Sequence, residues 1–181
     1  MATKSTIVLC EDETHRRFVY RWLLEKGLKQ NELRLVPLSA GRGAGFQHVL
    51  SRYAEEMGQY RRKANHLQSR RLVVVLDGDL SGVEKRMAEL GDKLVQAAVE
   101  PRAAAERVCI LVPCRNAETW IHFFHGHPVD ETTEYKPFYQ GDDKATACRA
   151  AGRAFAEWLQ RPNVAGTPAS LLAARAEASR V

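Results

Sequence analysis

Short apolar runs alternate with longer stretches of helical periodicity along this chain. The runs with the length and composition of strands are residues 7–10, 33–38, 72–76 and 108–112. Runs that are apolar throughout are typical of parallel strands covered on both faces. Between and after them, apolar residues recur at three- and four-residue steps, which predicts helices at 14–27, 46–67, 83–97, 121–124 and 142–159. The alternation predicts an α/β fold: a three-layer sandwich with a mostly parallel central sheet of about four strands.

The length of the chain fits a single domain. Its 181 residues, of which 45% are apolar, are enough for one hydrophobic core. Pro162 and Pro168 interrupt the helical pattern, and an alanine-rich segment follows them. We therefore expect one domain at residues 1–160 and a C-terminal tail at residues 161–181 that forms a marginal helix with a frayed end.

Composition narrows the classes of protein that fit. The net charge of +5 permits a polyanionic partner without requiring one. No run of about 18 apolar residues is present, and the start lacks the zones of a signal peptide, so we expect a cytoplasmic protein with no membrane partner. The scattered cysteines lack the close pairs of zinc sites, and we expect reduced, mostly buried thiols at Cys10, Cys109, Cys114 and Cys148.

Acidic residues follow three of the predicted strands. Glu11 follows the first, Asp77 and Asp79 follow residues 72–76, and Glu118 lies a few residues past 108–112. In an open parallel sheet, ligands bind beyond the carboxyl ends of the strands. Converging there, these carboxylates would form a hard-oxygen site suited to Mg²⁺ or Mn²⁺.

Grouped carboxylates need a compensating cation. They raise each other's pKa unless positive charge neutralises them, so a converging set predicts a bound divalent metal. Such an ion can polarise a phosphoryl oxygen, and a pair of ions can also stabilise the leaving oxygen, as in nucleases. For any one of these acids, the alternative is an ordinary loop residue or helix cap.

Three stretches of the chain resemble the Toprim superfamily, the catalytic domain of topoisomerases, bacterial primases and overcoming-lysogenization-defect nucleases. They are Val8–Thr14, which leads into a helix, Val73–Asp79 with its Asp-Gly-Asp, and Val112–Trp120, which is similar to a region of small stand-alone Toprim proteins. The similarity covers about Ile7–Leu159 and implies a Toprim/Rossmann-like fold.

The resemblance also implies roles for individual residues. Glu11 would act as a general acid or base or join the metal site, and Asp77 and Asp79 would bind the metal. Glu118 would complete a second metal site, and Lys144 would be a basic residue near the scissile phosphate. Carried over together, these roles give an Mg²⁺- or Mn²⁺-dependent nuclease acting on DNA or RNA.

The resemblance also implies partners, and the sequence departs from the family pattern at one position. Its small members are linked to phage defence, which implies a place in a bacterial defence system beside a partner ATPase. Many members have glycine after the first glutamate, whereas this chain has Asp12. The resemblance is therefore incomplete at the residue that follows Glu11.

Arginines near the predicted site are candidates for phosphate binding. Arg16 and Arg17 lie just beyond Glu11, where a guanidinium can clamp a phosphate. Arg42 is the charged residue of the glycine-rich loop at residues 41–45, and Arg115 lies in the third stretch that resembles Toprim proteins.

Two alternatives stay open. In a phosphoacceptor receiver domain, Glu11 and Asp12 would bind magnesium, Asp77 would accept phosphate, and Lys136-Pro137 would imitate the lysine-proline turn of that class. The predicted helix at 46–67 lengthens the spacing from Glu11 to Asp77, and no clear strand precedes Lys136, which favours the Toprim interpretation. The other alternative is a Toprim-like subunit without activity of its own.

Overall fold

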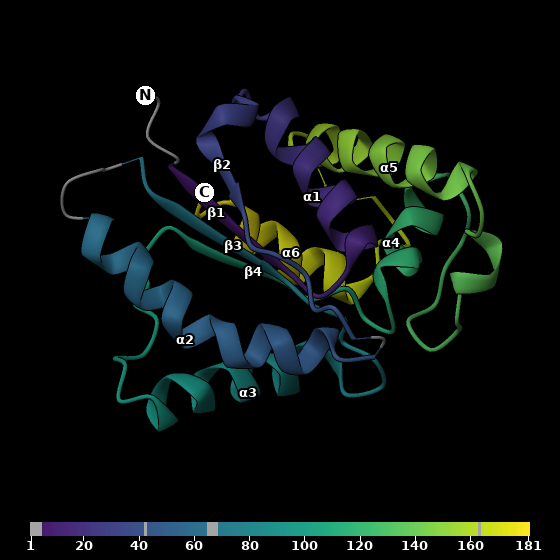
Figure 1. Ribbon diagram of the computed structural model, residues 1–181. Coiled ribbons are helices and arrows are strands. Elements are labelled where there is room, and N and C mark those ends of the chain that lie inside the picture. Colours follow the sequence, from purple (N-terminus) through teal and green to yellow (C-terminus); the bar gives the residue numbers. More distant parts are fainter. Residues whose placement is uncertain (1–4, 42, 65–68, 163) are drawn as a thin grey trace.

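The computed structural model describes residues 5–41, 43–64, 69–162 and 164–181. The strands form one all-parallel sheet in the order β2-β1-β3-β4 (Figure 1). Their bounds are Thr6–Cys10 for β1, Leu33–Leu35 for β2, Arg71–Val75 for β3 and Val108–Leu111 for β4. The predicted α/β fold with a central sheet of about four parallel strands is confirmed.

Helices cover both faces of this sheet and make the outer layers of the sandwich (Figure 1). One face packs against α2 (Gly45–Ala64) and α3 (Gly82–Gln96). The opposite face packs against α1 (Glu13–Glu25), α4 (Ala117–Phe124), α5 (Asp143–Leu159) and α6 (Ala169–Ala178). Two short 3₁₀ turns, Gln30–Glu32 and Lys136–Phe138, lie in the connections. Residues 65–67, which the sequence assigns to the long helix, lie outside the described part of the chain.

The strands are apolar throughout because successive side chains enter different cores. In β1, Ile7 and Leu9 join the core under α2 and α3, whereas Val8 and Cys10 join the other one. Side chains in a strand alternate between faces, so a strand covered on both sides has no polar face.

The second strand is shorter than the predicted 33–38. Paired residues end at Leu35, although the backbone N–H of Val36 still donates to the carbonyl of Val8 at 2.8 Å. The next residue is Pro37, which has no N–H to donate to a ladder. The early end of β2 therefore follows from the proline.

Aromatic rings fill the core between α1, α4 and α5. Phe155 lies at the centre, with ring centroids 5.3–5.9 Å from those of Phe18, Trp22, Trp120 and Trp158. Trp120 and Trp158 are both buried in this core. Helices α1 and α5 approach closely at Gly152, where a Cβ atom would lie 2.3 Å from the carbonyl oxygen of Phe18.

The C-terminal helix α6 belongs to this core. The sequence predicts a marginal helix with a frayed end, but Leu171, Ala174 and Ala178 are buried against the sheet. Beside them, Glu177 accepts a hydrogen bond from the backbone N–H of Ile110 at 2.9 Å. Packing on the sheet, which helix propensity does not measure, makes the segment part of the fold.

The outer edge of β4 is occupied by an ion pair. Arg102 donates to the carbonyl of Val108 at 3.0 Å and also pairs with Glu177, which holds the N–H of Ile110. Both backbone groups point away from β3 and would otherwise be unpaired. Arg102 and Glu177 together take the place of a neighbouring strand.

The cysteines are free thiols, and Cys10, Cys109 and Cys148 are buried as predicted, with Cys114 partly exposed. Burial raises the pKa of Cys148 to about 11, so its thiolate is scarce at neutral pH. Within the described residues, no helix is both long enough and apolar enough to cross a membrane.

Candidate functional site

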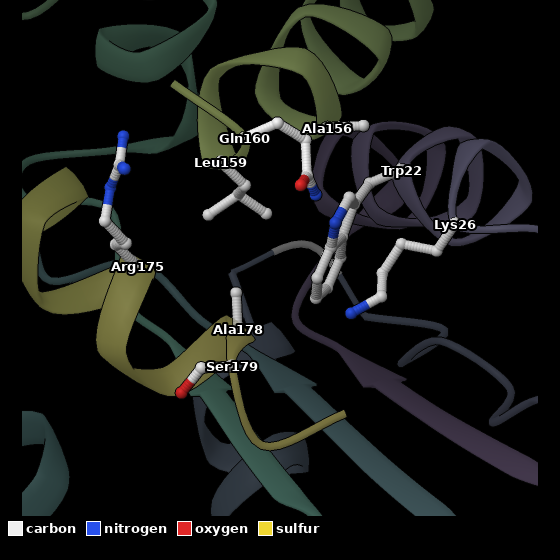
Figure 2. A pocket seen from close by; sticks show the side chains of 8 residues that line it. All are labelled: Trp22, Lys26, Ala156, Leu159, Gln160, Arg175, Ala178 and Ser179. Carbon is white, nitrogen blue, oxygen red and sulfur yellow. The ribbon is translucent and has the colours of Figure 1, made fainter. Parts of the chain in front are cut away.

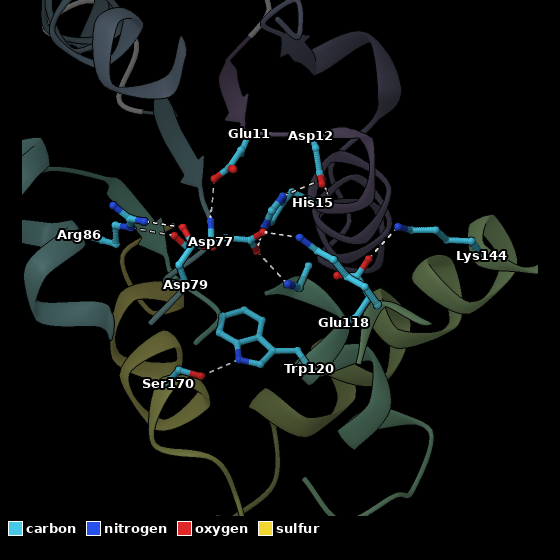
Figure 3. Close-up of polar contacts among 12 residues, drawn as sticks. Glu11, Asp12, His15, Asp77, Asp79, Arg86, Glu118, Trp120, Lys144 and Ser170 are labelled. Carbon is cyan, nitrogen blue, oxygen red and sulfur yellow. Dashed lines mark hydrogen bonds and ion pairs between the residues drawn. The ribbon is translucent and has the colours of Figure 1, made fainter. Parts of the chain in front are cut away.

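The carboxyl ends of β1 and β3 bring Glu11 and Asp77 together. The two strands run in register from Thr6 opposite Arg71 to Cys10 opposite Val75, and the N–H of Glu11 continues the ladder to Val75. One step further, a carboxylate oxygen of Glu11 accepts the backbone N–H of Asp77 at 2.9 Å (Figure 3). The sequence expectation that these acids meet at one edge of the sheet is met for this pair.

A pocket of about 330 Å³ opens in front of these two acids. Its walls come from the start of α1, from the glycine-rich loop before α2, and from Lys136. Gly45 begins α2 directly against Glu11, and a Cβ atom there would lie 2.5 Å from the carbonyl oxygen of Glu11. Gly45 thus allows the loop to close over the end of β1.

His15 lies between two carboxylates at the centre of the site. Its Nδ1 is 2.8 Å from a carboxylate oxygen of Asp12, and its Nε2 is 2.9 Å from Oδ1 of Asp77 (Figure 3). The imidazole is 1% exposed and Asp77 is 5% exposed. With a carboxylate at each ring nitrogen, both nitrogens act as donors, which is the protonated form of histidine.

The local charges account for the shifted pKa values. Burial alone would lower the pKa of His15, but the charges of Asp77 and Asp12 raise it well above 6.5. Burial would raise the pKa of Asp12, but the charge and hydrogen bonds of His15 hold it well below its usual range. Burial, followed by the charge of Asp77, raises the pKa of Glu11 above 4.5. Glu11 therefore binds a proton more readily than an exposed glutamate does.

The same local structure explains how α1 delivers His15. Asp12 is the N-cap of α1, and its side chain accepts the backbone N–H of His15 at 2.9 Å. An N-cap side chain commonly accepts the N–H of the third helical residue. Because His15 occupies that position, its ring can also reach the capping carboxylate and, on the other side, Asp77.

Asp77 is further held by a helix and faced by a lysine. Its Oδ1 accepts the backbone N–H of Ala117, the first residue of α4, at 2.9 Å. Its Oδ2 faces the ammonium of Lys136 at 3.8 Å. Burial would lower the pKa of Lys136, but the charges of Asp77 and Glu118 raise it. The lysine is thus a firmly charged cation at the mouth of the pocket.

Asp79 is not turned toward Glu11. Its carboxylate is 58% exposed and pairs with Arg86 of α3 at 2.6 Å. Its backbone is in the left-handed region, with φ of 47°, and its carbonyl accepts the N–H of Arg115 at 3.0 Å. Gly78, between the two aspartates, packs closely on the carbonyl of Pro113. The Asp-Gly-Asp sequence therefore forms a turn that separates the two aspartates.

Glu118 lies on another side of Asp77, within α4 (Figure 3). It is almost completely buried, and Lys144 of α5 donates to it at 2.7 Å. The two residues predicted for a metal ligand and a phosphate contact are therefore paired with each other. Together with Asp79 and Arg86, they show that cations of the chain neutralise acids that the sequence assigns to a metal.

The predicted phosphate-binding arginines have separate environments. Arg16 and Arg17 both pair with Glu13, and they line a neighbouring hollow of about 430 Å³ together with Tyr20. Arg115 faces Glu134 at 3.7 Å. The fourth candidate, at position 42, lies outside the described residues.

The donor set can be compared with what a divalent ion needs. The described residues contain no group of three or more His, Cys, Asp and Glu side chains arranged to hold a metal ion. Mg²⁺ is commonly held by only one or two carboxylates together with water and substrate phosphates. Oε1 of Glu11, which has no hydrogen-bond partner among the described residues, and Oδ2 of Asp77 fit such a site.

Sequence reasoning missed His15 altogether and considered Lys136 only for the receiver alternative. The signal for His15 was present, since a histidine three residues after a capping aspartate lies at the end of β1. No local signal connects Lys136 to Asp77, because the two are 59 residues apart (136 − 77) and meet through the loop after α4.

Comparison with protein-family models, with curated proteins and with solved structures finds no match to this chain.

Proposed function

We propose that this protein is an Mg²⁺- or Mn²⁺-dependent, Toprim-type nuclease or related phosphodiester-processing enzyme acting on DNA or RNA. The observation that carries the proposal is the meeting of Glu11 and Asp77, from adjacent parallel strands, beside a pocket that Lys136 also lines. Ligands of open parallel sheets bind at this edge.

The charges of the pocket suit a phosphodiester substrate. Glu11 and Asp77 would hold the divalent ion, which supplies Lewis-acid polarisation of the scissile phosphate. The ammonium of Lys136 faces the same pocket and would bind a phosphate oxygen. If Asp77 alone holds the ion, Oε1 of Glu11, which has no hydrogen-bond partner among the described residues, would instead accept a proton from the attacking water, a role that its raised pKa favours.

His15 would position Asp77 without touching substrate. Its N–H and that of Ala117 both hold Oδ1, which leaves Oδ2 directed toward Lys136. A carboxylate with one oxygen fixed by two donors has little rotational freedom. The second oxygen is thereby held ready for the ion or the substrate.

The wider proposal concerns partners and location. The excess of basic residues and the arginines beside Tyr20 support a nucleic-acid substrate. Asp79 and Lys144 keep their proposed catalytic roles only if substrate or metal displaces their partners Arg86 and Glu118. The family resemblance implies a place in bacterial phage defence beside a partner ATPase, and the lack of a long apolar run or signal-peptide zones in the sequence supports a cytoplasmic location.

The test is cleavage of supercoiled plasmid and of single-stranded RNA, with and without Mg²⁺ or Mn²⁺. The variants Glu11→Gln and Asp77→Asn remove one charge each, and general acid-base groups typically contribute about 100-fold to 10,000-fold to the rate. Asp92→Asn, an exposed acid on α3, is the matched control and should keep full activity. Metal-independent cleavage, or equal activity in all variants, would contradict the proposal. No cleavage by any variant would favour a subunit without activity of its own.

One contact supports the receiver alternative. Lys136 precedes a proline and its ammonium faces Asp77 at 3.8 Å, as expected if the lysine stabilises a phosphorylated aspartate. However, Oδ1 of Asp77 is committed to two donors, and the described residues contain no strand leading to Lys136. Incubation with acetyl phosphate decides the matter: acid-labile phosphorylation that Asp77→Asn abolishes would establish the receiver function.

A further inference from the structure

A second pocket, of about 250 Å³, lies at the far end of α1 from His15 (Figure 2). Its walls come from the ends of α1, α5 and α6, with Trp22, Leu159 and Ala178 as the apolar contributors. It shares no lining residue with the pocket at Glu11. Nothing in the proposed nuclease function uses it.

The indole N–H of Trp22 has no partner in this pocket. The side chain is 0% exposed, and its Nε1 is buried without a hydrogen bond to any described residue. Figure 2 shows this nitrogen on the edge of the ring that faces Gln160. By contrast, the buried indole of Trp120 donates to Ser170 at 2.8 Å. Buried donors are nearly always satisfied, so an orphaned one calls for an acceptor.

The charge around the pocket is positive. The ammonium of Lys26 lies 5.6 Å from the centre of the Trp22 ring. Burial, together with the charges of Arg71 and Arg107, lowers the pKa of Lys26. No carboxylate side chain lines the pocket. One ammonium hydrogen contacts the backbone oxygen of Val181, which leaves two of three donors available. The adjoining hollow, which shares Lys26 with this pocket, is lined by Glu25 and Glu157, and Glu25 is itself paired with Arg21 and Arg153.

The remaining wall combines the apolar side chains of Ala156, Leu159 and Ala178 with the polar ones of Gln160, Arg175 and Ser179. Arg175 lines the pocket but is committed elsewhere: its guanidinium stacks on Trp158 at 3.9 Å and donates to the carbonyls of Trp158 and Arg161. Leu159 and Ala178 supply hydrocarbon surface. Ligand pockets for drug-sized molecules usually span about 300–1,000 Å³. A cavity of about 250 Å³, below this range, suits a smaller ligand with an apolar part.

We propose that this pocket binds a small organic carboxylate. One carboxylate oxygen accepts the N–H of Trp22, the charge interacts with Lys26, and the hydrocarbon part lies against Leu159 and Ala178. The site is independent of the proposed nuclease function, because its residues take no part in that chemistry.

The indole N–H resonances of the ¹⁵N-labelled full chain provide the test. The probes are benzoate and propionate, with benzamide as the neutral analogue and inorganic phosphate as an anion without hydrocarbon. The expected result is a saturable shift of the Trp22 resonance with the carboxylates alone. The resonances of Trp120, which is already bonded, and Trp158, which lies outside the pocket, should not move.

Variants separate the contributions. Trp22→Phe keeps a ring but removes the N–H, and Lys26→Gln removes the charge. Each should weaken benzoate binding about 10-fold to 100-fold, because a hydrogen bond to a charged group contributes on that scale. Lys93→Gln, which removes the charge of a lysine on α3 outside the pocket, should leave the affinity unchanged. Binding that survives Lys26→Gln undiminished, equal binding of benzamide or phosphate, or no shift of Trp22 with any probe would overturn the proposal.

Discussion

Replacing His15 by alanine should destabilise the protein more than replacing any exposed histidine. The imidazolium bonds Asp12 at 2.8 Å and Asp77 at 2.9 Å and is itself 1% exposed. Alanine leaves the negative charge of Asp77 with the N–H of Ala117 at 2.9 Å and the more distant ammonium of Lys136 at 3.8 Å, in a site that water barely reaches. The loss therefore combines two missing charge-assisted hydrogen bonds with an uncompensated buried charge.

The magnitude follows from these contacts. Removing one partner of a buried ion pair costs about 3–5 kcal/mol. Typical domains are stable by about 5–15 kcal/mol, so the variant would lose a large share of its stability. For a chain of this length, about 2–4 °C of melting temperature correspond to each kcal/mol. The expected decrease in Tm is therefore about 6–20 °C.

Urea unfolding followed by circular dichroism at neutral pH measures the difference. His48→Ala is the matched control, because the His48 ring is partly exposed and its hydrogen bond within the described residues is to the carbonyl of Pro37, at 2.9 Å. Its cost should stay below about 1 kcal/mol. A cost of His15→Ala equal to that of the control would refute the charged arrangement of His15 between its two carboxylates.

Two further predictions concern a glycine and a surface pair. Gly45→Ala should cost about 1–3 kcal/mol in urea unfolding and reduce any nuclease activity, because its Cβ would collide with Glu11. Gly58→Ala, on the same helix with no atom within 4 Å, should be neutral or stabilise by up to about 1 kcal/mol. Arg61 donates a hydrogen bond to Glu106 and lowers its pKa despite burial. The contribution of this ion pair to the free energy of unfolding should therefore be present above about pH 4.5 and be lost as the pH falls through the folded-state pKa of Glu106. Unfolding of wild type and Glu106→Gln across this range tests the sign, and a difference that grows with acidity would contradict it.

The positions of the strands could be predicted from the sequence because a buried strand is recognisable as a short, uninterrupted apolar run. A strand covered on both faces must be apolar throughout, so β1, β3 and β4 were each located to within about one residue. Their parallel direction followed from the helices between them. The meeting of Glu11 and Asp77 was a further consequence, since parallel strands end at the same edge.

The partners of the acids could not be predicted in the same way. Asp79 pairs with Arg86 and Glu118 with Lys144, and each choice depends on how a neighbouring helix packs. The sequence indicates which charges are near the sheet edge but not how they are matched. For the same reason it assigned Glu118 and Lys144 to different roles, although the structure pairs them.

The ion pair on the outer edge of β4 has a consequence for the protein's resistance to aggregation. An open parallel edge with free N–H and C=O groups is a template for strands of other molecules. Here the carbonyl of Val108 accepts a hydrogen bond from Arg102, and the N–H of Ile110 donates to Glu177, which belongs to α6. A chain shortened before Ala169 would expose this edge together with the apolar surface under the helix. The C-terminal helix therefore prevents strands of other molecules from pairing with this edge, and aggregation should be the first effect of its loss.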